Sequence, residues 1–172
     1  MASRKRISKF RVNQHVVYPS HGVGKIVAVE NMMIGDEEHE LYVISIAKEK
    51  LTLRVPTAKA RETGVRGLAT AEEIAKALET LKGRAQVKRA MWSRRAQEYD
   101  QKINSGLLQN IAEVVRDLHR SDDQREQSFS ERQLYESAVD RLSREIAAVE
   151  GVDLSVALKR VGEVLDGRSS RS

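Results

Sequence analysis

Residues 64–81, GVRGLATAEEIAKALETL, contain the point at which the hydrophobic pattern of this chain changes. The first part, from Gly64 to Leu68, has two glycines and is typical of a tight connection. Thr70 and Glu73 then have the spacing of a capping box, which marks the start of a helix. Apolar residues follow at helical spacing, at Ile74, Leu78 and Leu81. The stretch therefore predicts the boundary between a β-rich module and a helical domain.

Before this boundary, apolar and polar side chains alternate with a period of two, which is typical of short strands. The alternating runs are residues 15–18, 24–29, 41–46 and 51–55. Pro56 stops the fourth strand or marks a sheet edge. The polar segment 34–38 contains Gly35, which can adopt positive φ, and it predicts a hairpin tip. Short strands with tight connections predict a small β-barrel, which the less regular residues 57–68 close.

After the boundary the pattern predicts a bundle of about five helices. The first ends at Gly83, and a polar linker, residues 120–127, precedes a long helix that Gly151 ends. That helix is capped by Ser128 with Glu131 or by Ser130 with Gln133, and Asp153 caps the last helix. The expected apolar faces after the first helix are Trp92, Ala96, Tyr99 and Ile103; Leu107, Ile111, Val114 or Val115, and Leu118; Leu134, Ala138, Leu142, Ile146 and Val149; and Leu154, Leu158, Val161 and Leu165.

The predicted fold class is therefore α+β, with a small N-terminal β-barrel followed by an all-α C-terminal domain. We expect the barrel to span residues 13–69 and the helical domain to span residues 70–167. The ends, residues 1–12 and 168–172, are expected to be flexible tails, the first of them basic.

The composition narrows the class of protein. The 172 residues are 40% hydrophobic and 32% charged, which is typical of a soluble folded protein. The absence of cysteine excludes disulfides, thiolate metal sites and cysteine nucleophiles, and it fits a reducing compartment. No export signal or membrane-spanning run is expected. We expect a cytoplasmic protein without a membrane partner.

Positive charge is concentrated in two segments. The net charge is +5, but residues 1–11 carry five positive charges and residues 82–97 carry six, and neither segment contains an acidic side chain. The rest of the chain therefore has a net charge of −6. The tail allows two interpretations, a solvated surface or a surface that faces phosphate, and the internal segment is the better candidate for the second. Its cations are Lys82, Arg84, Lys88, Arg89, Arg94 and Arg95.

The sequence has no pattern that indicates an enzyme. The four histidines, His15, His21, His39 and His119, are scattered and have no carboxylates at metal-ligand spacing, so no metal is expected. Gly22-Val23-Gly24 lacks the third glycine and the helix of a dinucleotide site, and a turn explains it better. We expect no cofactor and no small-molecule substrate.

Trp92, the only tryptophan, lies between the pairs Lys88-Arg89 and Arg94-Arg95. Its helical spacing with Tyr99 allows the indole to pack in the bundle. Its position near the start of the helix allows a different interpretation, in which the ring projects toward nucleic acid. The cations would neutralise phosphates while the ring contacts bases or enters the minor groove. Spacing alone leaves both interpretations open.

Six motifs in this order resemble the CarD family of bacterial transcription regulators, also called CdnL. The motifs are VVYPSHGVGKI (16–26), LTLRVP (51–56), GVRGL (64–68), MWSRR (91–95), INSG (103–106) and IAEVVRDLHR (111–120). The resemblance implies that the barrel is a Tudor-like (SH3-like) module, akin to the polymerase-interacting domain of transcription-repair coupling factors. It implies docking on the β subunit of RNA polymerase by strand addition.

The resemblance also implies that the helical domain contacts promoter DNA at the upstream edge of the melted bubble, largely independently of sequence. Trp92 would be a minor-groove wedge that stabilises the open complex, and Arg94 would be the nearest backbone contact. Arg54 and Pro56 fall in the segment that contacts polymerase. Gln97 and Met32 depart from the family, because some members have a basic residue at the first position and arginine at the second.

The function expected from the sequence is that of a non-enzymatic transcription regulator, active as a monomer and associated with the nucleoid through RNA polymerase. We expect Trp92, Arg94, Arg95, Lys88 and Arg89 to contact DNA. Two alternatives differ in class. One is a freestanding architectural or RNA-binding protein whose barrel holds nucleic acid, and the other is a protein–protein adaptor in which Trp92 is buried.

Overall fold

The computed structural model describes residues 10–86, 89–120 and 128–169. The chain forms two compact units that divide between Leu68 and Ala69. The first unit is built on five strands, and a short helix, α1 (Ala60–Thr63), precedes the last of them. The strands are β1 (His15–Tyr18), β2 (Gly22–Ile34), β3 (Glu37–Ile46), β4 (Leu51–Pro56) and β5 (Arg66–Gly67).

The five strands form one antiparallel sheet in the order β4-β3-β2-β1-β5. β4 and β5 are the outer strands, and they do not pair with each other in the part of the chain that the structure describes. The sheet is therefore open, and the predicted barrel is only approximate. Pro56 lies at the end of an outer strand, a position at which proline is tolerated in a sheet.

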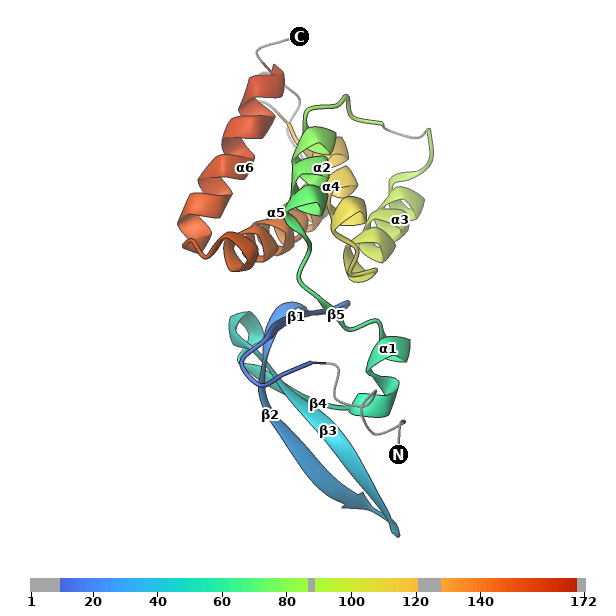
Figure 1. The fold of residues 1–172 in the computed structure, drawn as a ribbon. Helices are drawn as coiled ribbons and strands as arrows, with labels where there is room; N and C mark the ends of the chain where they lie inside the picture. Colours follow the sequence, from blue (N-terminus) through green and yellow to red (C-terminus); the bar gives the residue numbers. More distant parts are fainter. Residues whose placement is uncertain (1–9, 87–88, 121–127, 170–172) are drawn as a thin grey trace. The chain divides into compact units, whose positions relative to one another are not determined.

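The hairpin of β2 and β3 is longer than the alternation predicted (Figure 1). The turn lies within the expected tip, residues 34–38, but the predicted bounds are too wide, because β2 extends to Ile34 and β3 begins at Glu37. Gly35 has a φ of +66° in the turn. The side chains from residue 31 to residue 38 are all exposed, so no buried face imposes an alternating pattern there.

The core of the first unit lies on one face of the sheet. Tyr42 is fully buried, and its hydroxyl accepts a hydrogen bond from the Phe10 backbone N–H at 3.1 Å. Gly24 leaves room for this core, because a Cβ atom there would lie 2.6 Å from Ile46 Cδ1 and 2.8 Å from Ile44 Cγ2. Gly24, the second glycine of the Gly22-Val23-Gly24 segment, is therefore required for the packing of this core. The buried members are Phe10, Val16, Ile26, Tyr42, Ile44, Ile46, Val55, Ala60 and Val65.

In its described residues the second unit contains five helices, as predicted. Thr70 and Glu73 make both hydrogen bonds of a capping box at the start of the first, and Gly151 ends the fourth in the left-handed conformation. The helices are α2 (Ala71–Leu81), α3 (Trp92–Asn104), α4 (Leu108–Leu118), α5 (Phe129–Glu150) and α6 (Leu154–Ser169). In the described ranges, no helix is long and apolar enough to cross a bilayer.

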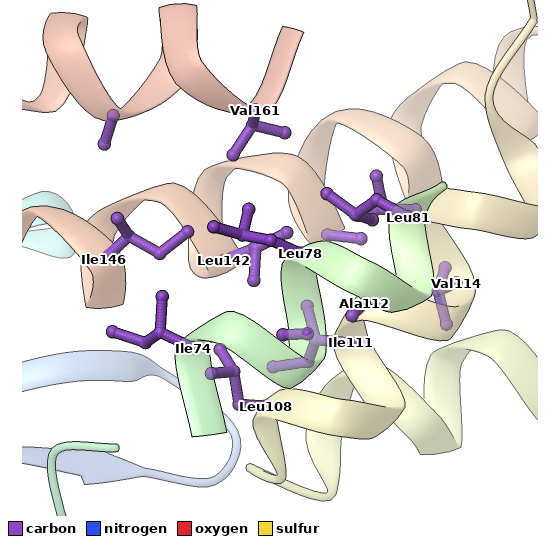
Figure 2. Close-up of a cluster of buried hydrophobic side chains, with 14 of the residues drawn as sticks. Ile74, Leu78, Leu81, Leu108, Ile111, Ala112, Val114, Leu142, Ile146 and Val161 are labelled. Carbon is purple, nitrogen blue, oxygen red and sulfur yellow. The ribbon is translucent and has the colours of Figure 1, made fainter. Parts of the chain in front are cut away.

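The helical core joins α2, α4, α5 and α6, as Figure 2 shows for Leu78, Ile111, Leu142 and Val161. Two apolar residues predicted to face this core do not. Leu107 is 54% exposed, since it precedes the helix and the buried position belongs to Leu108. Leu158 is 39% exposed, because α6 turns Ala157, Val161 and Leu165 inward instead.

A buried carboxylate, that of Glu145, binds the backbone of the first residue of the helical unit. Glu145 is 2% exposed, and its Oε2 accepts a hydrogen bond from the Ala69 backbone N–H at 2.7 Å. This N–H lies just before the capping box of α2, and Ala69 itself is buried. The first residue of the second unit is therefore bonded to the C-terminal part of α5, five residues before that helix ends.

Candidate nucleic-acid interface

The helices α3 and α5 pack against each other, and two hydrogen bonds show that they run in the same direction. Near the start of both, the Trp92 indole N–H donates to Ser130 Oγ at 2.9 Å. Eleven residues further along both helices, Arg141 Nη1 donates to the carbonyl oxygen of Ile103 at 3.1 Å. Because both bonds join matching positions, the N-terminal ends of α3 and α5 lie together.

Trp92 is partly buried at this joint end. Its ring packs on the edge of the helical core and lies 6.3 Å, between centroids, from the ring of the buried Tyr99. Ser128 caps α5 by accepting the Glu131 N–H, and this leaves the hydroxyl of Ser130 for the indole. The structure thus gives an arrangement between the two predicted ones, since the ring is held at the core edge without being enclosed by it.

Arg95 lies beside two aromatic rings. Its guanidinium carbon is 5.4 Å from the centroid of Trp92 and 5.8 Å from that of Tyr99, and Nη2 donates to the Tyr99 hydroxyl at 3.4 Å. A cation at this distance from an aromatic face is attracted by the ring. The three residues have the spacing i, i+3 and i+7, so they share one face of α3. Arg95 therefore restrains the indole.

The predicted DNA-contacting residues divide into two groups. Arg94, in the first turn of α3, and Arg89, just before that helix, are exposed. Arg95 is only partly exposed, and its guanidinium lies against the Trp92 ring, so it is less accessible to DNA than Arg89 and Arg94. Lys88 lies outside the described residues. Trp92, Arg94 and Arg89 are thus close along the chain at the joint end of α3 and α5.

The basic segment that leads to Trp92 is attached to α4. Asp117 is 3% exposed, and its Oδ1 accepts the Gln86 backbone N–H at 2.9 Å and the Arg116 Nε–H at 2.8 Å. A carboxylate that accepts bonds from a backbone amide and a guanidinium forms charge-assisted hydrogen bonds, which are stronger than neutral ones. Asp117 therefore limits how far the segment before Arg89 can move from the bundle.

The three residues predicted to contact polymerase share one face of the first sheet. In the observed register Pro56 lies opposite Leu41 and Arg54 lies opposite Val43, two positions along. Met32 lies opposite His39, two positions before Leu41 on β3. Since side chains alternate between faces with a period of two, Arg54, Pro56 and Met32 point to the same side. Met32 is 42% exposed.

Arg54 makes an ion pair on this face. Its Nε lies 3.5 Å from Glu30 Oε2, and both side chains are about half exposed, at 49% and 46%. An exposed pair of this kind contributes little to stability, because water and salt screen it. Arg54 can therefore exchange Glu30 for another acidic partner at small cost.

Three residues of this site were not predicted from the sequence to be functional candidates: Ser130, Tyr99 and Asp117. The sequence held one signal for Ser130. Ser128 and Ser130 were both candidate caps of α5, and because only one can cap the helix, the other hydroxyl is available for a different contact. Tyr99 was expected on the correct helical face, but its contact with Arg95 follows only from the three-dimensional arrangement. Asp117 lies in no sequence pattern that distinguishes it.

A metal centre is not formed by the described residues, in which no three His, Asp or Glu side chains lie close enough to hold an ion. His21 instead pairs with Glu49 at 2.6 Å, and His39 with Glu37 at 3.5 Å. His119 Nδ1 shares a hydrogen bond with the Tyr135 hydroxyl at 2.9 Å.

Comparisons with known proteins agree with this division of the chain. The model of the CarD-like/TRCF RID domain matches residues 10–69, and that of the CarD C-terminal domain matches residues 76–161. A relative, "Putative transcription factor YdeB" of Bacillus subtilis (strain 168), is 27% identical over 143 residues, which cover 83% of this chain and 94% of YdeB. With both halves matched in order, the chain belongs to the CarD family.

Proposed function

We propose that this chain is a non-enzymatic transcription regulator that binds the β subunit of RNA polymerase through its first unit. Its second unit contacts promoter DNA at the upstream edge of the bubble and stabilises the open complex. Membership of the CarD family and the similarity to YdeB support the role in transcription. We expect the chain to act as a monomer in the cytoplasm.

The arrangement of Trp92 carries the DNA part of this proposal. The indole is oriented by Ser130 and Arg95 but is only partly enclosed by the core. A ring that is already oriented loses little side-chain entropy when it binds. Exposed cations at Arg89 and Arg94 suit the flanking phosphates, which position a protein on DNA without reading its sequence. Such a site recognises distorted DNA.

In the proposed mechanism, Trp92 stabilises the open complex by filling the space between separated bases. When the duplex opens, Trp92 enters the minor groove at the last base step, so the bubble can close only after the ring has left. Opening a step by unstacking costs a few kcal/mol. A ring contact worth about 1.4 kcal/mol changes an equilibrium tenfold, which is enough to prolong the open state.

The polymerase part rests on the shared face of Arg54, Pro56 and Met32, and on the family's RID domain at residues 10–69. β4 is an outer strand, so its free edge can accept a strand from a partner. Tethering to polymerase is needed because so few phosphate contacts give affinities of only about 10⁻⁴ to 10⁻⁶ M.

The lifetime of the open complex on a ribosomal RNA promoter tests this function. With purified polymerase and the wild-type chain we expect a longer lifetime than with polymerase alone. Trp92→Ala should lose most of this effect while it still binds polymerase. Arg54→Glu should lose both the effect and the binding. Lys159→Glu, the same charge reversal on an exposed residue of α6, is the matched control.

Two results would contradict the proposal. One is a Trp92→Ala protein that remains folded by circular dichroism and prolongs the open complex as well as wild type. The other is a first unit whose main partner is RNA, detected as tight RNA binding that Arg54→Glu leaves unchanged.

A further inference from the structure

Phe129 and Met91 are large apolar side chains exposed at the same end of the helical unit as Trp92. Phe129 is 77% exposed and Met91 is 79% exposed. Met91 precedes Trp92, and Phe129 precedes Ser130, which is bonded to the indole at 2.9 Å. The Cα atoms of adjacent residues are only about 3.8 Å apart. The two exposed residues therefore flank the Trp92–Ser130 contact, one on each helix.

We propose that Phe129 is a second aromatic contact of this chain with DNA and that it stacks on an unpaired base next to the step occupied by Trp92. This inference rests on the function proposed above. In its sequence position Phe129 begins α5, so its ring has no preceding helical turn to pack on. Scattered exposed apolar residues are ordinary, but apolar side chains grouped beside a partly exposed tryptophan indicate an interaction surface.

The charge around the ring favours a nucleic acid over a protein. Arg89, Arg94 and Arg132 are exposed at this end, and the first turn of α3 has no acidic residue. The acidic side chain in the first turn of α5, Glu131, is mostly covered and lies 3.8 Å from Arg120 Nη2. Among the described residues, the first turns of α3 and α5 therefore present no uncompensated carboxylate to a phosphate backbone.

An unpaired base is a better partner for the Phe129 ring than a base within a duplex. In a duplex both faces of each base are stacked on neighbours, so a phenyl ring can reach only base edges. At the border of a bubble a base with one free face is available, and aromatic side chains stack on such faces irrespective of sequence. Phe129 thus extends the contact from the distorted step to the first unpaired nucleotide.

The test compares a fork-junction DNA, which has unpaired bases beside a duplex, with a duplex of the same sequence. Binding of the full chain is followed at low salt by the anisotropy of labelled DNA. We expect Phe129→Ala to weaken fork binding about fivefold or more and to leave duplex binding nearly unchanged. Phe129→Tyr should restore fork binding, because it keeps the aromatic face. Val156→Ala, 52% exposed on α6, is the control and should bind as wild type.

An unchanged affinity of Phe129→Ala for the fork would overturn the inference, as would an equal loss on both DNAs, which would mean a groove contact. A loss of polymerase binding without a loss of DNA binding would also overturn it, because the ring would then contact protein. Trp92→Ala in the same assay separates the two proposals. If Trp92→Ala weakens fork binding and Phe129→Ala does not, only this inference fails; if neither weakens it, the proposed DNA contact fails as well.

Discussion

Arg94 and Arg95 are consecutive cations with different surroundings. Arg94 is exposed in the first turn of α3, whereas the guanidinium of Arg95 lies against Trp92 and Tyr99. The Nε of Arg95 is buried and has no hydrogen-bond partner among the described residues. The aromatic contacts are therefore the main compensation for its desolvation. A count of charges along the sequence does not distinguish the two residues. In the structure the Arg94 side chain is available to a phosphate, whereas the Arg95 side chain holds the Trp92 ring in place.

Replacement of each arginine by methionine distinguishes these purposes. We expect Arg95→Met to lower the free energy of unfolding by about 1 kcal/mol, the value of a partly desolvated cation–π contact. Arg94→Met should change it by less than about 0.5 kcal/mol. Arg94→Met should instead reduce the slope of log K for DNA against log salt by about 1, because one phosphate contact is lost. Urea unfolding and salt titrations measure both effects.

The two variants control for each other, since each removes one positive charge and inserts the same side chain. A larger loss of stability in Arg94→Met than in Arg95→Met would contradict the assignment of Arg95 as a positioning residue.

At the scale of the element, the start of α5 assigns separate tasks to two serines. Ser128 Oγ accepts the Glu131 N–H at 3.2 Å, and Ser130 Oγ accepts the indole N–H of Trp92. The first bond stabilises α5 itself, and the second links α5 to α3.

Serine-to-alanine variants separate these tasks. Ser128→Ala should lower the free energy of unfolding by about 1 kcal/mol, as the loss of a helix cap does. Ser130→Ala should cost less, because water can replace an exposed acceptor, but it should change the emission of Trp92. Trp92 is the only tryptophan, so its fluorescence reports this contact directly. Equal emission spectra for Ser130→Ala and wild type would contradict the indole–serine bond.

Helix boundaries were predictable because their signals are local. The capping box of Thr70 and the αL glycine at Gly151 are read from a few adjacent residues, and the structure confirms both. The length of the β2–β3 hairpin was not predictable, because its outer part has no buried face. The choice between Leu158 and Ala157 depends on how α6 packs on α5, which spacing within one helix does not specify.

The candidate site was predictable only in part, for a similar reason. The sequence brings Trp92 and its cations together, because they are adjacent in the chain. The pairing of α3 with α5 joins residues that are 38 positions apart, Trp92 and Ser130, and no local pattern indicates this pair. The second aromatic ring, Phe129, becomes visible only through that pairing.

At the scale of the whole molecule, positive charge is divided between two segments, residues 1–11 and residues 82–97. If the second segment faces DNA with about four phosphate contacts, log K should fall with log salt with a slope of about −3 to −4. Removal of residues 1–9 takes away four positive charges, Arg4, Lys5, Arg6 and Lys9. We expect this truncation to leave the slope nearly unchanged in salt titrations with duplex DNA. A fall in the slope by more than about 1 would show that the tail also contacts phosphate.

The bond between Ala69 and Glu145 has a mechanical consequence. In the proposed complex one unit would be bound to polymerase and the other to promoter DNA, so tension along the chain would arrive at Ala69. The Ala69 N–H is buried and donates to Glu145 in the C-terminal part of α5, so this force would act on α5 as well as on α2. Trp92 would then keep its proposed contact with DNA while the connection between the two units is under tension.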